Sequence, residues 1–93
     1  MNKAELVDAI SEKIDASKRE TDTILTAIVE EIMAAVVSGN KVTLVGFGSF
    51  EPRFRQARSG RNPKTGETMA ISATRVPGFS AGKSFKDKVA LAT

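Results

Sequence analysis

The sequence predicts an α+β fold with two N-terminal helices, a three-stranded antiparallel sheet extended into a β-ribbon arm, and a short C-terminal helix. Apolar residues recur at helical spacing as far as residue 37 and then alternate with a period of two. A turn rich in Gly, Asn and Pro, residues 59–66, divides the alternating region into two strands. A length of 93 residues is typical of a single domain.

The two helices are expected over residues 3–14 and from Ser17 to Ser38. Asn2 and Ser17 each precede an acidic residue by three positions, which is the capping-box pattern of a helix N-terminus. Gly39 follows the last apolar position of the second helix and is expected at its C-cap.

The apolar stripe of the second helix is two residues wide at every turn, which one short partner helix cannot cover. The helix either lies deep within the core of its own chain or packs one edge against a second subunit. The small size of the chain and the absence of Cys favour the second arrangement, a homodimer. The expected dimer core consists of Ile28, Ile32, Val36, Leu44, Phe47, Phe50 and Phe79.

The strands follow Asn40. Residues 41–45 are expected to form the first strand, residues 46–48 a tight connection, and Ser49 onward the second strand. The third strand is expected over residues 68–76 and to end at Pro77-Gly78, before a closing helix that Gly82 opens. If the ribbon folds about Lys64, Arg53 lies opposite Arg75, and Arg61 lies opposite Glu67.

Positive charge is concentrated in residues 53–75, which carry six basic residues and one acidic residue, whereas the whole chain has a net charge of +3. Residues 1–40 have four basic and eight acidic residues, a net charge of −4. Like charges that face each other across a two-stranded ribbon destabilise it unless a polyanion binds there. The one-signed, Arg-rich hairpin therefore predicts binding to double-stranded DNA.

Catalysis, metal binding and membrane insertion find little support in the sequence. The chain has no His and no Cys, and its acidic residues lie beside basic ones on helix faces, so neither an enzyme, a metal site nor a cofactor is expected. The segment 78–84 is one residue short of a phosphate-binding loop. No signal peptide is recognisable, and the longest apolar run has six residues, so a soluble cytoplasmic protein is expected. Residues 45–50 partly match an RNA-recognition motif, which keeps an RNA-binding module as a distant alternative.

The motifs Gly46-Phe47-Gly48-Ser49-Phe50 and Gly60-Arg61-Asn62-Pro63-Lys64-Thr65-Gly66, followed by Val76-Pro77, Phe79 and Gly82-Lys83, resemble the bacterial histone-like HU and integration-host-factor superfamily. The resemblance covers nearly the whole chain. It implies an intertwined homodimer without a small-molecule substrate or a membrane partner, whose two arms wrap DNA through the minor groove. The implied organisation of residues 1–93 is a helical dimerisation base (1–40), a sheet with its closing helix (41–52 and 76–93) and a DNA-binding arm (53–75).

The resemblance also implies roles for individual residues. Pro63 is the wedge that enters a base step at the tip of the arm, beside Asn62. The implied DNA contacts are Arg53, Arg55, Arg58, Arg61, Lys64 and Arg75 on the arm, with Lys3, Lys83 and Lys86 on the flank. Phe54, Ser72 and Ser80 depart from the usual residues at their positions, which affects the expected affinity and bend angle. A sequence-preferring bender like integration host factor is the nearer alternative. Because arginines in a minor groove sense its width more than its sequence, the arm favours a nonspecific nucleoid protein.

Overall fold

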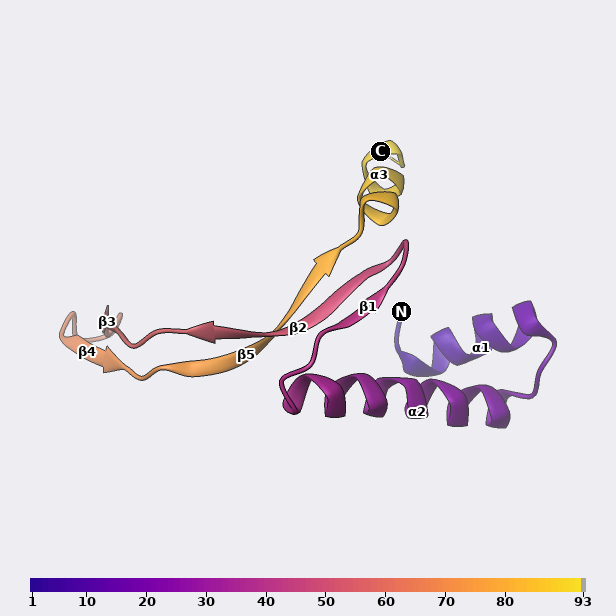
Figure 1. Cartoon of the computed structure of the whole chain (residues 1–93), viewed down its shortest axis with the longest axis horizontal. Helices are drawn as coiled ribbons and strands as arrows, with labels where there is room; N and C mark the ends of the chain where they lie inside the picture. Colours follow the sequence, from indigo (N-terminus) through magenta and orange to yellow (C-terminus); the bar gives the residue numbers. More distant parts are fainter. Residues whose placement is uncertain (93) are drawn as a thin grey trace. The chain divides into compact units, whose positions relative to one another are not determined.

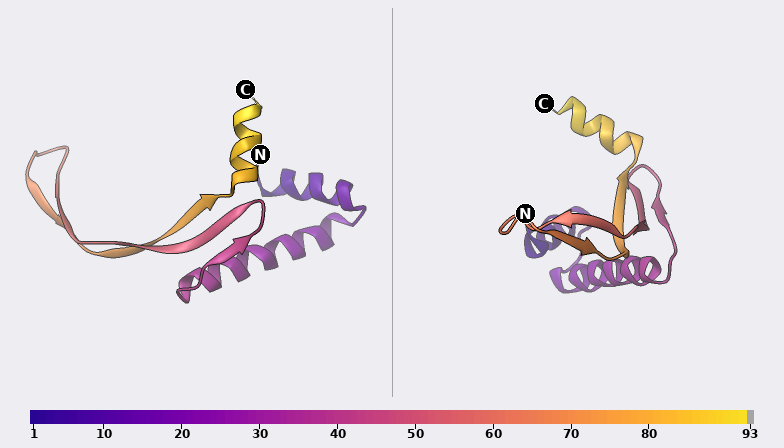
Figure 2. Two further views of the ribbon diagram at one scale, coloured as in Figure 1. Left: turned by 45° about the horizontal axis from the view of Figure 1, so that its top comes forward. Right: turned by 90° about the vertical axis from the view of Figure 1, so that its left-hand side faces the viewer.

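The computed structural model describes residues 1–92, and its elements follow the predicted order. Their bounds are α1 (Lys3–Ile14), α2 (Lys18–Val37), β1 (Val42–Leu44), β2 (Gly48–Arg55), β3 (Arg58–Arg61), β4 (Thr68–Ile71), β5 (Thr74–Ala81) and α3 (Lys83–Leu91). The predicted α+β fold is confirmed (Figures 1 and 2). The chain forms two compact units, Met1–Ala34 and the part from Ala35 onward. None of the described helices is long and apolar enough to cross a membrane.

The first unit is a pair of helices whose starts are capped as the sequence predicts. The Oδ1 atom of Asn2 accepts a hydrogen bond from the backbone N–H of Glu5 at 2.9 Å, and Ser17 Oγ accepts one from Glu20 N–H at 3.0 Å. These side chains satisfy backbone donors that have no partner within the helix. Asp15 ends α1 in the left-handed region, with a φ of 54°.

Helix α2 ends in a Schellman motif, as Gly39 predicts. The backbone N–H of Gly39 donates to Val36 O at 3.0 Å, and that of Asn40 donates to Ala35 O at 2.9 Å. Gly39 has a φ of 92°, a conformation that glycine adopts without a steric penalty from Cβ. The chain thereby reverses from the helix into β1.

The second unit is built on an antiparallel sheet in the order β1-β2-β5. Val42, Phe50 and Phe79 lie side by side across the three strands, so one face of the sheet is apolar. Phe50 and Phe79 have ring centroids 4.9 Å apart, and Phe47 lies 5.2 Å from Phe79 and 5.5 Å from Phe85 of α3. This aromatic cluster connects the closing helix to the sheet.

Apolar side chains remain widely exposed in the single chain. Val7 is the only buried hydrophobic residue among residues 1–92. Along α2 the exposed fractions are 48% for Ile28, 57% for Met33 and 76% for Val37. Ile32, Val36 and Phe50 are intermediate, and Leu44, Phe47 and Phe79 are exposed. All seven residues of the expected dimer core therefore keep apolar surface that their own chain does not cover.

The third strand is longer than the sequence predicts, because Pro77-Gly78 does not end it. Strand β5 continues to Ala81, with Pro77 opposite Pro52 and Gly78 opposite Glu51. Proline lacks an N–H, so it fits a strand only where no partner needs that donor. Strand β5 lies at an edge of the sheet, and β1 pairs with β2 only from Gly48 to Phe50, so neither proline interrupts a ladder on its other side.

The predicted register of the ribbon was wrong by one residue. Arg53 lies opposite Val76 rather than Arg75, and Arg61 lies opposite Thr68 rather than Glu67. The cause is the length of the loop: Asn62 N–H donates to Glu67 O at 2.8 Å, which leaves four residues, 63–66, in the turn. An even loop centres the ribbon between two residues instead of on Lys64. The expected facing pairs of like charges are consequently absent from the paired positions of the described strands.

The ribbon is interrupted between the sheet and its tip. Strands β3 and β4 form a separate two-stranded sheet, and residues 56–57 and 72–73 are unpaired between it and β2–β5. The register is the same on both sides of this gap, since Arg55 pairs with Thr74 and Arg58 pairs with Ile71. In Figure 1 the paired strands continue from the sheet to the β3–β4 hairpin. Ser72 lies within the unpaired segment.

Candidate nucleic-acid interface

The tip of the arm is an ordered turn built by backbone hydrogen bonds. Gly66 N–H donates to Asn62 O at 2.7 Å, and Lys64 N–H donates to Asn62 Oδ1 at 2.9 Å. Gly66 has a φ of 74°, which suits glycine. Asn62 thus organises the turn through its main chain and its side chain, and Pro63 lies exposed next to it.

Four basic side chains of the arm are exposed and make no hydrogen bond or ion pair with the described residues: Arg55, Arg58, Arg61 and Lys64. Successive side chains of a strand alternate between its faces, so Arg58 and Arg61 project from opposite faces of β3. The arm therefore presents positive charge on both of its sides. Such a distribution suits a ribbon that enters a groove and has phosphates on either side.

Arg53 and Arg75 are bound by their own chain, unlike the other arm residues. Arg53 Nη2 donates to Ser80 Oγ at 2.9 Å and forms an ion pair with Glu51 at 3.6 Å. Arg75 Nη2 lies 3.5 Å from the backbone O of Val36, near the C-terminus of α2, where a cation is favourable. Both residues lie at the base of the arm, so the structure separates them from the unpaired basic residues nearer the tip.

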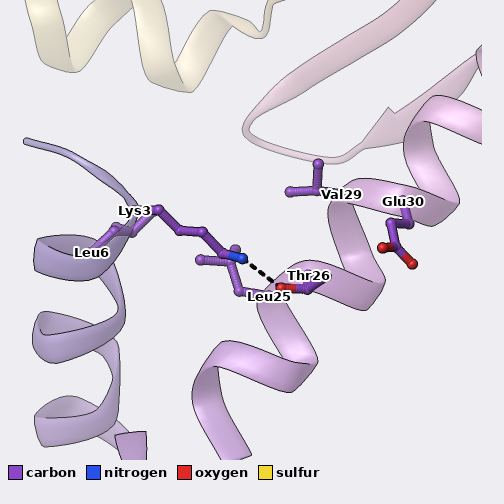
Figure 3. A pocket seen from close by; sticks show the side chains of 6 residues that line it. All are labelled: Lys3, Leu6, Leu25, Thr26, Val29 and Glu30. Atoms are coloured by element: carbon purple, nitrogen blue, oxygen red, sulfur yellow. Dashed lines mark hydrogen bonds between the residues drawn. The ribbon is translucent and has the colours of Figure 1, made fainter. Parts of the chain in front are cut away.

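Lys3 is also engaged by its own unit. Its Nζ atom donates to Thr26 Oγ1 at 2.6 Å (Figure 3). The same atom lies 3.4 Å from Asp22 Oδ1, so Lys3 has an acidic neighbour. The two other flank residues, Lys83 and Lys86, are exposed on α3, and their ammonium groups have no partner among residues 1–92.

An open apolar hollow lies between α1 and α2. It is lined by Lys3, Leu6, Leu25, Thr26, Val29 and Glu30 (Figure 3). Leu6 is 38% exposed and Val29 is 46% exposed. The hollow belongs to the uncovered apolar surface of the helices. Within the described residues, no cluster of three or more acidic side chains could hold a metal ion.

Phe54 and Ser80, two of the three unusual residues, have different surroundings. Phe54 is 68% exposed and lies opposite Arg75. Ser80 accepts the hydrogen bond from Arg53.

Sequence reasoning missed the contribution of Glu51 and Gly78 to the surroundings of Arg53. The i, i+2 spacing of Glu51 and Arg53, which places opposite charges on one strand face, was a signal for the role of Glu51. The role of Gly78 could be found only with the correct register of β5 against β2.

Comparisons with known proteins agree with this architecture. Residues 1–90 match the family model described as bacterial DNA-binding protein. The chain is 66% identical to the DNA-binding protein HU of Nostoc sp., covering 97% of this chain and 96% of the relative, and 53% identical to that of Clostridium pasteurianum, covering 96% and 98%.

Two solved structures extend the comparison. An Anabaena HU–DNA cocrystal structure matches with a TM-score of 0.92 and 66% identity, covering 97% of this chain and 98% of that one. HU from Thermotoga maritima matches with a TM-score of 0.68 and 36% identity, covering 96% and 98%. These similarities extend over both units and the arm, and this chain belongs to the bacterial DNA-binding protein family that includes HU.

Proposed function

We propose that this protein binds double-stranded DNA with little sequence preference and bends it, as an architectural protein of the bacterial nucleoid. The observation that carries the proposal is the exposed ribbon with its unpaired Arg55, Arg58 and Arg61 around an ordered Asn62-Pro63 turn. Its relatives named DNA-binding protein HU, and the HU–DNA cocrystal structure of 66% identity, support the same function. The role is structural rather than catalytic.

The functional unit is an intertwined homodimer. Residues 1–40 form the dimerisation base, and the second subunit covers the apolar surface around Ile28, Ile32 and Val36 of α2. Leu44, Phe47, Phe50 and Phe79 join this core from the sheet. Burying half-exposed apolar side chains is favourable by roughly 25 cal/mol for each Å² removed from water. The single chain lacks such burial, because Val7 is its only buried hydrophobic residue among residues 1–92.

In the dimer, two arms (residues 53–75) follow the minor groove on either side of the DNA. Arg55, Arg58, Arg61 and Lys64 neutralise phosphates, and Pro63 inserts between base pairs at the tip. HU is itself a known example of the minor-groove proteins that kink DNA with apolar wedges. The unstacking costs a few kcal/mol and is offset because bent DNA contacts more of the protein.

The remaining predicted contacts lie nearer the body. The sheet and closing helix, residues 41–52 and 76–93, present Lys83 and Lys86 to the flanks of the bent DNA, and Thr93 falls outside the described residues. Lys3 reaches DNA only if it leaves Asp22 and Thr26. Arg53 and Arg75 contact phosphates at the base of the arm.

A salt-titrated gel shift tests the function. Linear, nicked and kinked duplexes of unrelated sequence are compared with single-stranded RNA. We expect tight binding to all three duplexes, with the highest affinity for the nicked and kinked ones. Preference for one duplex sequence would indicate a site-specific bender, and binding to the RNA alone would indicate an RNA-binding module.

A further inference from the structure

Arg53 differs from the arginines further along the arm because the sheet holds its guanidinium group. Nη2 donates to Ser80 Oγ at 2.9 Å and lies 3.6 Å from Glu51 Oε1. Glu51 and Arg53 are two residues apart on β2, so their side chains share one face of the sheet. Ser80 lies on the same face, since its partner on β2 is Ser49. Arg53 is therefore bound between two polar side chains.

Gly78 leaves the space that this position of Arg53 requires. It lies opposite Glu51, and a Cβ atom at residue 78 would overlap the Nε, Cδ and Cζ atoms of Arg53. Gly78 does not have a positive φ, so its backbone conformation does not itself require glycine. The overlapping atoms belong to the flexible end of a side chain. Alanine at this position would therefore displace Arg53 with little cost to the fold.

We propose that Glu51, Gly78 and Ser80 are positioning residues, which orient Arg53 toward a DNA phosphate at the base of the arm. The inference rests on the DNA-binding function proposed above. The N–H groups of Nε and Nη1 have no partner among residues 1–92, and the side chain of Arg53 is 49% exposed. A guanidinium donates charge-assisted hydrogen bonds to phosphate oxygens. Here Nη2 is held by Ser80 and Glu51, and Nε and Nη1 remain available as donors.

Two effects of this arrangement oppose each other. Glu51 lowers the positive potential near Arg53, which weakens attraction to DNA. The fixed side chain, in contrast, loses less conformational entropy when it binds a phosphate. A half-exposed ion pair contributes little and is screened by salt. At physiological ionic strength screening weakens both the field of Glu51 and its hold on Arg53, so the hydrogen bond to Ser80 and the space at Gly78 supply most of the orienting effect.

The test measures the affinity of the full-length protein for one duplex at 150 mM salt, with a thermal unfolding curve for every variant. Gly78→Ala and Ser80→Ala are each expected to weaken binding about two- to tenfold for each arm of the dimer, the range for ordering one long side chain on binding. Ser49→Ala is the matched control, because Ser49 lies opposite Ser80 and bonds Thr43 instead. The double variant Gly78→Ala/Arg53→Gln should bind no more weakly than Arg53→Gln.

Three other outcomes would overturn the inference, each for a different reason. If Gly78→Ala weakens binding equally with and without Arg53, glycine acts on something else. If Arg53→Gln weakens binding while Gly78→Ala and Ser80→Ala do not, Arg53 binds DNA without being positioned. If Arg53→Gln has no effect although the protein binds duplex DNA, Arg53 does not bind a phosphate. Absence of any duplex binding by the unmodified protein would instead refute the proposed function.

Discussion

Pro52 and Pro77 lie directly opposite each other across strands β2 and β5. Neither residue has a backbone N–H, so this pair cannot exchange the two hydrogen bonds of an antiparallel ladder. On one side of the pair lies the aromatic cluster of Phe50 and Phe79, and on the other side the ribbon has no aromatic packing. The two prolines therefore mark the boundary between the packed sheet and the arm.

This boundary should be visible in amide hydrogen exchange. Residues 55–73 should exchange quickly in the free protein, because a two-stranded ribbon with unpaired residues opens easily. The paired residues 48–51 and 78–81 should exchange more slowly. DNA should slow exchange in the arm much more than in the sheet. Equal protection of the arm with and without DNA would show that it is rigid before binding.

Pro63→Ala should separate bending from binding. The substitution removes the wedge and leaves every charge in place, so the bend angle of an intact duplex should fall while the salt dependence of affinity stays nearly the same. Energy transfer between dyes at the two ends of a duplex measures the angle. On a nicked duplex, where bending costs less, the variant should bind like the unmodified protein. An unchanged bend angle would leave Pro63 with the role of a turn residue.

Arg61→Gln, in contrast, should weaken binding to every duplex and reduce the salt dependence of the affinity. Each phosphate that the protein neutralises contributes about −0.9 to the slope of log affinity against log salt, so removing one cation from the arm should make the slope shallower by about that amount per phosphate. If the dimer neutralises roughly 6–10 phosphates, the unmodified protein should bind about a thousandfold or more weakly at 200 mM than at 50 mM salt. Arg19→Gln, which changes the one arginine outside the arm and its base, is the control and should leave the slope unchanged.

Ile28→Glu should disrupt the dimer. Ile28 is 48% exposed in the single chain, so a charge there would be tolerated by a monomer but would be buried in the dimer interface. Sedimentation at low micromolar concentration should give twice the chain mass for the unmodified protein and a smaller or unfolded species for the variant. Thr23→Glu, at an exposed position on another side of α2, should remain dimeric. A folded monomer for the unmodified protein would contradict the expected interface.

Gly39→Ala should lower the free energy of unfolding by about 1 kcal/mol, because an L-residue in the left-handed region costs roughly 1–2 kcal/mol. Denaturant unfolding measures the change. Gly78→Ala, where φ is not positive, should cost less and serves as the comparison.

The sequence predicted the elements well and their mutual packing less well. Helix ends could be predicted because Asn2, Ser17 and Gly39 act on backbone groups within a few residues. The strand register could not, because it depends on whether the loop after Asn62 has an even or an odd number of residues. Because the register was wrong by one residue, the sequence also did not show that Gly78 lies opposite Glu51 and beside Arg53. The end of β5 was misjudged because Pro77 is compatible with a strand only where no neighbouring strand needs its N–H, which depends on how distant residues pair.

The constant register across the unpaired residues 56–57 and 72–73 limits how the arm can change in length. Inserting one residue in one strand would turn every arginine beyond it to the opposite face. Insertion of two residues in each strand would keep every side chain on its face. Such a step lengthens the arm by about 6.6 Å. Arms of this kind should therefore evolve, or be engineered, in matched dipeptide increments.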